Sequence, residues 1–222
     1  AMGIEILPPN INLSDGVFNA VDNKIVYGLI GVKNVGSGAV EHIISEREAN
    51  GPFSTFMEFL NRIDVKQTNR KTLESLIKAG AFDSLGDNRA TLLLNLESVT
   101  DYIVRGKEAV QFGQTSLFDT HEEESLGNFE MQQVDEISSS ERLEFERELL
   151  GFYFSGHPLD EFRDIWKRCV RIDLSRPDRL TNNRISNLMG IVTNKRSIVT
   201  RKGDPMAFVT IEDFLGSIEL VI

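Results

Sequence analysis

The run Val35-Gly36-Ser37-Gly38 is the first place in this chain where residue type and spacing indicate chemistry. It precedes a segment, residues 39–48, whose apolar residues recur at helical spacing. Glycines let a backbone approach another surface closely, and the start of the following helix presents N–H groups and a positive dipole end. This arrangement suits a phosphate, so with Lys33 beside it the run predicts a helix-hairpin-helix contact with a nucleic-acid backbone. A tight helical hairpin that binds nothing is the alternative.

A second glycine corner is expected at Gly80-Ala81, between helical patterns at residues 69–80 and 88–103. Four bases flank this corner, namely Arg70, Lys71, Lys78 and Arg89. Tandem corners can hold phosphates on both strands of a duplex, so the amides of both corners and the nearby bases are the predicted DNA-binding groups. Residues 61–93 hold six bases and four acids, and this weak excess also fits an ordinary solvated face.

The third candidate is the pattern formed by Gln114, Leu117 and Phe118 inside a polar, acidic stretch without periodicity. An apolar pair in such a stretch has no core to join, and exposed anchors of this kind usually occupy the pocket of a partner. The spacing resembles the peptide by which bacterial proteins bind the sliding clamp. A chance match of three positions is the alternative.

Charge and composition exclude several function classes. The formal charge is −10, but residues 108–148 hold twelve acids and two bases, so the flanking parts are nearly neutral and can carry basic faces. The single cysteine, Cys169, excludes an internal disulfide and a multi-cysteine metal site. No serine, cysteine or histidine arrangement indicates catalysis, so no catalytic or metal residue is predicted. No apolar run reaches membrane-spanning length and no secretory signal is visible, so a cytoplasmic protein is expected.

The expected fold is mainly α with a small β part. Along the chain it reads as an extended entry segment (1–27), a tandem helix-hairpin-helix domain (28–104), an acidic loop with the clamp peptide (105–137) and a helical connector (138–184). Residues 185–222 are expected to form a truncated OB-type meander, with strands at 188–192, 206–211 and 217–222. Basic residues cluster at its first hairpin, which raises single-strand binding as an option, namely Lys195, Arg196, Arg201 and Lys202. Ser138 with Glu141 forms a capping-box pattern at the start of the connector.

The order of these pieces resembles the bacterial C-family replicative polymerases, the DNA polymerase III alpha subunits. The resemblance covers residues 3–222, and its most specific strings are Tyr27-Gly28-Leu29, the first corner, Leu76-Ile77-Lys78-Ala79-Gly80-Ala81-Phe82-Asp83 and Glu148-Leu149-Leu150-Gly151-Phe152-Tyr153-Phe154-Ser155-Gly156-His157-Pro158-Leu159-Asp160. It implies the region after the fingers: tandem hairpins that hold duplex DNA, a clamp-binding segment and the start of an OB domain.

The resemblance also implies what this chain does not contain. The parent would be a DNA-directed DNA polymerase, a nucleotidyltransferase whose magnesium-binding palm lies upstream of Gly3, so this chain is expected to be inactive and to need no cofactor. Its implied partners are double-stranded DNA, the sliding clamp (the beta ring) and other replisome subunits, with no membrane. The alternatives are a stand-alone hairpin protein of DNA repair, a protein-binding scaffold and an error-prone polymerase of the same family.

Overall fold

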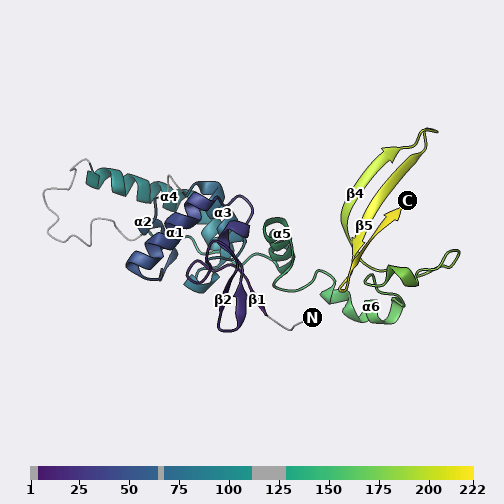
Figure 1. Cartoon of the computed structure of the whole chain (residues 1–222). Helices are drawn as coiled ribbons and strands as arrows, with labels where there is room; N and C mark the ends of the chain where they lie inside the picture. Colours follow the sequence, from purple (N-terminus) through teal and green to yellow (C-terminus); the bar gives the residue numbers. More distant parts are fainter. Residues whose placement is uncertain (1–4, 65–67, 112–128) are drawn as a thin grey trace. The chain divides into compact units, whose positions relative to one another are not determined.

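The computed structural model describes residues 5–64, 68–111 and 129–222, and it contains two compact units, Ala1–Phe154 and Ser155–Ile222 (Figure 1). The first unit is mostly helical and the second carries an antiparallel sheet. The expected fold class, mainly α with a small β part, is confirmed. The units divide between Phe154 and Ser155, inside the range 138–184 that was expected to form one connector.

The first unit begins with a small sheet whose strands are β1 (Ile6–Leu7), β2 (Asn19–Val21) and β3 (Lys24–Val26). The central strand, β3, pairs parallel with β1 and antiparallel with β2. Asp22 and Asn23 join β2 to β3 with φ angles of 50° and 62°, a left-handed pair that a two-residue hairpin requires. The sheet delivers the chain to a single turn, η1 (Leu29–Gly31), directly before the first glycine corner.

The described residues of the first unit also form α1 (Ser37–Asn50), α2 (Phe56–Arg62), α3 (Arg70–Lys78), α4 (Arg89–Gln111) and α5 (Ser139–Leu150), with a short turn η2 (Asp83–Leu85) before α4. The core between them is aromatic: the ring of Phe82 lies 5.0 Å from that of Phe56 and 4.8 Å from that of Phe59, both edge-on. All three side chains are almost completely buried, so the two expected hairpins pack on one shared core.

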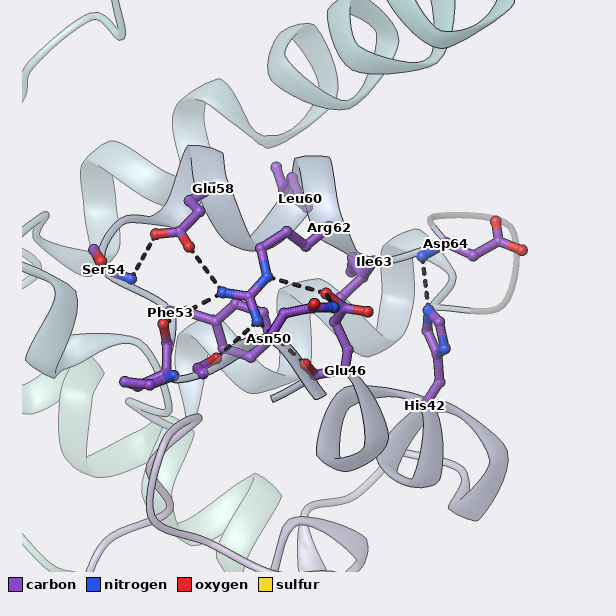
Figure 2. Close-up of polar contacts among 12 residues, drawn as sticks. His42, Glu46, Asn50, Phe53, Ser54, Glu58, Leu60, Arg62, Ile63 and Asp64 are labelled. Atoms are coloured by element: carbon purple, nitrogen blue, oxygen red, sulfur yellow. Dashed lines mark hydrogen bonds and ion pairs between the residues drawn. The ribbon is translucent and has the colours of Figure 1, made fainter. Parts of the chain in front are cut away.

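Arg62 ties the end of α1 to α2 through a cluster of polar contacts (Figure 2). Its guanidinium donates to the carboxylates of Glu46 at 3.1 Å and Glu58 at 2.8 Å, and to the carbonyl of Gly51 at 2.7 Å. It also lies 4.3 Å above the ring of Phe53. Every charge in the cluster has an opposite charge beside it, so we assign the cluster a structural role in holding α1 against α2.

The helix α4 and the segment after it differ from the expectation. A loop was expected over residues 105–137, whereas α4 continues to Gln111, and residues 129–136 lie extended along its flank. Asn95 makes two bonds to the backbone of Gln132: its amide donates to the carbonyl at 2.9 Å, and its carbonyl accepts from the N–H at 3.0 Å. Because polar side chains of α4 replace the missing backbone partners, this strap (residues 129–136) is ordered without regular structure of its own.

The capping box expected at Ser138 is confirmed, with the Ser138 hydroxyl accepting from the Glu141 amide and the Glu141 carboxylate accepting from the Ser138 amide. It starts α5, which ends at Gly151 with a φ of 86°. The helix packs against α3 and belongs to the first unit.

The second unit consists of η3 (Asp160–Phe162), α6 (Arg163–Cys169), η4 (Pro177–Arg179) and the strands β4 (Ile191–Val199), β5 (Pro205–Glu212) and β6 (Ser217–Val221). The three strands form an antiparallel meander in chain order. The expected strand at 188–192 begins later and runs further, because β4 pairs with β5 as far as Val199. At the β5–β6 turn the buried Asp213 carboxylate accepts from the amides of Leu174, Leu215 and Gly216, which fixes the turn.

Candidate nucleic-acid interface

The first glycine corner presents an uncapped helix start to solvent. Gly36 is the N-cap of α1 and provides no side-chain capping bond, while Gly36, Ser37 and Gly38 are all exposed. A Cβ added at Gly36 or Gly38 would meet nothing within 4 Å. Since the first amides of a helix have no partner inside it, the amides of Ser37 and Gly38 face open space, and the described residues supply no other acceptor.

The corner is held rigidly from behind. Asn34 adopts a left-handed φ of 69°, and its side chain donates to the Ser75 hydroxyl at 3.2 Å. Its carbonyl accepts from the Thr72 hydroxyl at 3.1 Å, so the corner rests on α3. The Lys33 amide donates to the carbonyl of Leu149 at 3.0 Å, which adds a contact to the end of α5. Two helices distant in sequence, α3 and α5, therefore fix the direction in which the exposed amides point.

Three basic side chains lie near the first corner. The Lys33 ammonium is 60% exposed and lies 3.8 Å from the Glu148 carboxylate, a loose surface pair. Lys71 is exposed, and Arg70 pairs with Glu97 while staying 62% exposed. Both of these were expected to flank the second corner, but they start α3 and lie about 12 Å along its axis from its last residue. Contact between Thr72 and Asn34 puts their end of α3 beside the first corner instead.

The second corner has no comparable exposed amides. The Gly80 amide donates to Ile77 and the Ala81 amide to Leu76, each at 2.9 Å, which closes the end of α3 as a Schellman motif. Gly80 has a φ of 84°, and both residues are buried. The prediction that the Gly80 and Ala81 amides bind phosphate is therefore corrected, because both amides already donate to backbone carbonyls at the end of α3.

Arg89 and Lys78 are also engaged inside the unit. Arg89 is 4% exposed, and its guanidinium donates to both carboxylate oxygens of Asp83, at 2.9 and 2.7 Å, and to the Lys78 carbonyl at 2.9 Å. It packs on Gly80, where an added Cβ would lie 2.2 Å from the guanidinium. The Lys78 ammonium pairs with Glu74 and lies 5.0 Å from the Phe145 ring centre. The prediction that Arg89 contacts DNA is corrected, because a buried, doubly paired guanidinium cannot reach a phosphate.

Sequence reasoning missed two groups at the start of α4. The Asn88 side chain accepts from the Thr91 amide at 2.7 Å, as an N-cap does. The Glu136 carboxylate, carried by the strap, accepts from the Arg89 amide at 3.4 Å. Asn88 was detectable as a capping residue one position before the helix. Glu136 lies 47 residues away from Arg89 in sequence, so no local pattern indicated it.

The remaining predicted groups fall in two places. Gln114, Leu117 and Phe118 lie outside the described residues. In the second unit Lys195, Arg196, Arg201 and Lys202 are all exposed, and the Arg196 guanidinium lies 4.8 Å from the centre of the Phe208 ring. Over the described ranges no three potential metal ligands lie together, and none of the helices there has the length and apolar composition needed to cross a membrane.

Comparison with known proteins gives one consistent answer. Residues 3–92 match the family described as the helix-hairpin-helix motif. The whole chain matches proteins named DNA polymerase III subunit alpha, with 41% identity in Borreliella burgdorferi, 35% in Treponema pallidum and 38% in Thermus aquaticus. It covers 20, 19 and 18% of those three relatives respectively. The chain thus spans about a fifth of the length of the curated relatives it matches.

Proposed function

Because this chain belongs, over its whole length, to one segment of the DNA polymerase III alpha subunit family, we propose that it is a DNA-binding segment of a replicative DNA-directed DNA polymerase. The observation that carries the proposal is the exposed, uncapped start of α1 at Gly36. Its role is to grip the duplex by the backbone without reading sequence, since main-chain amides and a helix dipole recognise phosphate alone.

A phosphate at the first corner would accept hydrogen bonds from the amides of Ser37 and Gly38. The absence of any atom within 4 Å of a Cβ at Gly36 or Gly38 supports this, because that space admits a bulky anion. Lys33 and Lys71, both exposed, would neutralise adjacent phosphates and release their counterions. Arg70 can join them by exchanging Glu97 for a phosphate, since its present ion pair is solvent-exposed.

A duplex titration tests the grip directly. The variant Gly36→Val with Gly38→Val should keep its fold, because the new side chains enter open space, and should bind duplex DNA at least tenfold more weakly by fluorescence anisotropy. Ser45→Val, an exposed change in the middle of the same helix, is the matched control and should bind like the parent. Equal affinity of the folded double variant would show that other groups hold the DNA.

We further propose that Gln114, Leu117 and Phe118 tether the polymerase to the sliding clamp, the beta ring. Their support is the sequence pattern, with the glutamine amide as a hydrogen-bonding group and the two apolar side chains as pocket anchors. Tethering raises the local concentration of the enzyme on DNA without any new catalytic contact. Leu117→Ala with Phe118→Ala should abolish capture by the clamp in a pull-down and leave duplex binding unchanged. Undiminished capture would show that Leu117 and Phe118 do not bind the clamp.

The nucleotidyl transfer itself we assign to the remainder of the parent protein, where magnesium would be bound in the palm. The chain supplies grip and, through the clamp, processivity beside other replisome subunits, and we expect it in the cytoplasm. Primer extension with this chain alone should add no nucleotides. Incorporation by the purified chain would refute the division of labour.

The three strands of the second unit we propose to be part of an OB-type barrel. The exposed bases at the β4–β5 hairpin and the packing of Arg196 over Phe208 favour contact with single-stranded DNA by charge and stacking. Arg196→Ala should weaken binding of a single-stranded oligonucleotide and leave duplex binding intact. Unchanged single-strand affinity would leave this sheet without a role in binding.

A further inference from the structure

The start of α4 holds a carboxylate where the start of α1 is open. The Glu136 carboxylate accepts from the Arg89 amide, the first amide of the helix, at 3.4 Å. It also accepts from the Arg142 guanidinium at 3.3 Å. An anion at a helix start balances the positive dipole end in the same way that a phosphate does. Glu136 therefore occupies the position at the second hairpin that corresponds to the proposed phosphate position at the first.

The strap that carries Glu136 is held to α4 mainly by polar contacts. Besides the two bonds between Asn95 and Gln132, the Asn88 side chain donates to the Val134 carbonyl at 2.8 Å, and the Val134 amide donates to the Thr91 hydroxyl at 3.2 Å. Its apolar anchors are Phe129, whose ring is tilted against that of Tyr102 at a centroid distance of 5.3 Å, and the partly buried Met131. Segments with few buried apolar contacts open at low free-energy cost.

The strap is also negatively charged, which opposes the approach of DNA. Residues 129–136 contain three acids and no base. A strand of phosphates approaching the second hairpin would be repelled by the strap as long as it stays docked, and would replace it if it opens. When the strap is docked, the Glu136 carboxylate binds the start of α4 and Arg142. When it opens, a phosphate can bind both groups instead, so replacing one anion by the other leaves neither group unpaired.

We infer that the strap, residues 129–136, is an autoinhibitory element that closes the second hairpin to DNA until a backbone phosphate displaces Glu136. In the closed state the duplex is held at the first corner alone. In the open state the Arg89 amide and the Arg142 guanidinium become ligands for a second phosphate. The N···O distance of 3.4 Å is long for a hydrogen bond, and the Glu136 side chain is 34% exposed, so both favour exchange.

This inference rests on the proposed function, and a duplex titration of the whole 222-residue chain at low salt tests it. Glu136→Gln should bind duplex DNA about three- to tenfold more tightly than the parent, because it removes the competing anion. Asp135→Asn is the matched control: it removes the same charge from the adjacent, exposed residue, for which the described part of the chain gives no polar contact. It should gain less than about twofold. Equal gains in the two variants, or no gain in Glu136→Gln, would overturn the inference.

A charge-neutral variant separates opening of the strap from loss of a negative charge. Val134→Pro removes the amide that donates to Thr91 and should speed hydrogen exchange at the Gln132 amide, which the docked strap protects. Its duplex affinity should rise as in Glu136→Gln, and the double variant should gain no more than either alone. Faster exchange at Gln132 with unchanged affinity would count against an inhibitory role.

Addition of duplex DNA to the parent chain provides the third readout. The Gln132 amide should lose protection when the duplex binds at saturating concentration, whereas a strap that is only structural would keep it. The two proposals fail in different ways. If the parent and all strap variants bind no duplex, the proposed function fails; if all bind with equal affinity and Gln132 stays protected, only the strap inference fails.

Discussion

The two glycine corners of the first unit both lie at the end of a helix, but glycine has a different physical role in each. At the first, Gly36 and Gly38 have ordinary backbone angles, open space around them and helix amides without partners. At the second, Gly80 has a left-handed φ, its amide and that of Ala81 close a helix, and a buried guanidinium packs on it. One corner uses glycine to leave room for a ligand, and the other uses it to make a turn that only glycine tolerates.

The largest expected effect that separates the corners is on stability. Gly80→Ala should lower the free energy of unfolding by about 2–4 kcal/mol, because the left-handed backbone and the contact with Arg89 both oppose a Cβ. Gly38→Ala, inside the first turn of α1, should leave stability unchanged or raise it by up to about 1 kcal/mol. Urea unfolding followed by circular dichroism measures both, and equal losses would erase the distinction.

The second effect concerns the guanidinium at the closed corner. Arg89→Ala should cost about 2–3 kcal/mol of stability, because it leaves Asp83 and the Lys78 carbonyl without their charged donor. Arg70→Ala removes an exposed pair with Glu97 and should cost less than about 0.5 kcal/mol. A similar loss in both variants, measured by thermal unfolding, would contradict a structural role for Arg89.

A smaller effect should appear in DNA binding. Lys71→Ala should weaken duplex binding severalfold and lower the slope of log affinity against log salt by about 1, since one phosphate contact is lost. Lys78→Ala, whose ammonium is held by Glu74 and lies against Phe145, should leave the slope unchanged. Anisotropy titrations at several salt concentrations measure the slopes, and identical slopes for the two variants would place DNA across both corners.

The smallest effect is on the pH dependence of stability, at Glu58 in the first turn of α2. Hydrogen bonds from the Ser54 amide and from Arg62 hold the pKa of the Glu58 carboxyl below its ordinary value of 4.5. A pKa lowered by folding means that this contribution to stability is present above about pH 4.5 and is lost as pH falls through the lower, folded value. Glu58→Gln should therefore flatten the acid limb of a stability–pH curve. A curve with the slope of the parent would assign the acid limb to other carboxylates.

Local patterns predicted the helical unit well where short-range physics decides the outcome. The Ser138 capping box was found as expected, because its hydrogen bonds join residues three positions apart. The end of α4 was misjudged. Apolar periodicity stops near Ile103, and the helix nevertheless continues to Gln111. Lys107 shows one cause: its ammonium binds the Ile63 carbonyl at 2.9 Å, a contact that no sequence window contains.

For the candidate site, too, local sequence predicted some features and tertiary contacts decided the others. That a helix follows Gly36 was readable from residue types and spacing, since glycine permissiveness and helix periodicity are local properties, although the helix starts at Ser37 instead of at residue 39. Which corner keeps its amides exposed was decided by tertiary contacts: Asn34 resting on α3, Arg89 buried against Gly80, and Glu136 brought to the start of α4 from 47 residues away. A group becomes buried or hydrogen-bonded to a distant residue only when distant segments pack together. These contacts determine whether a hydrogen-bond donor is already bonded within the protein or is available to a ligand.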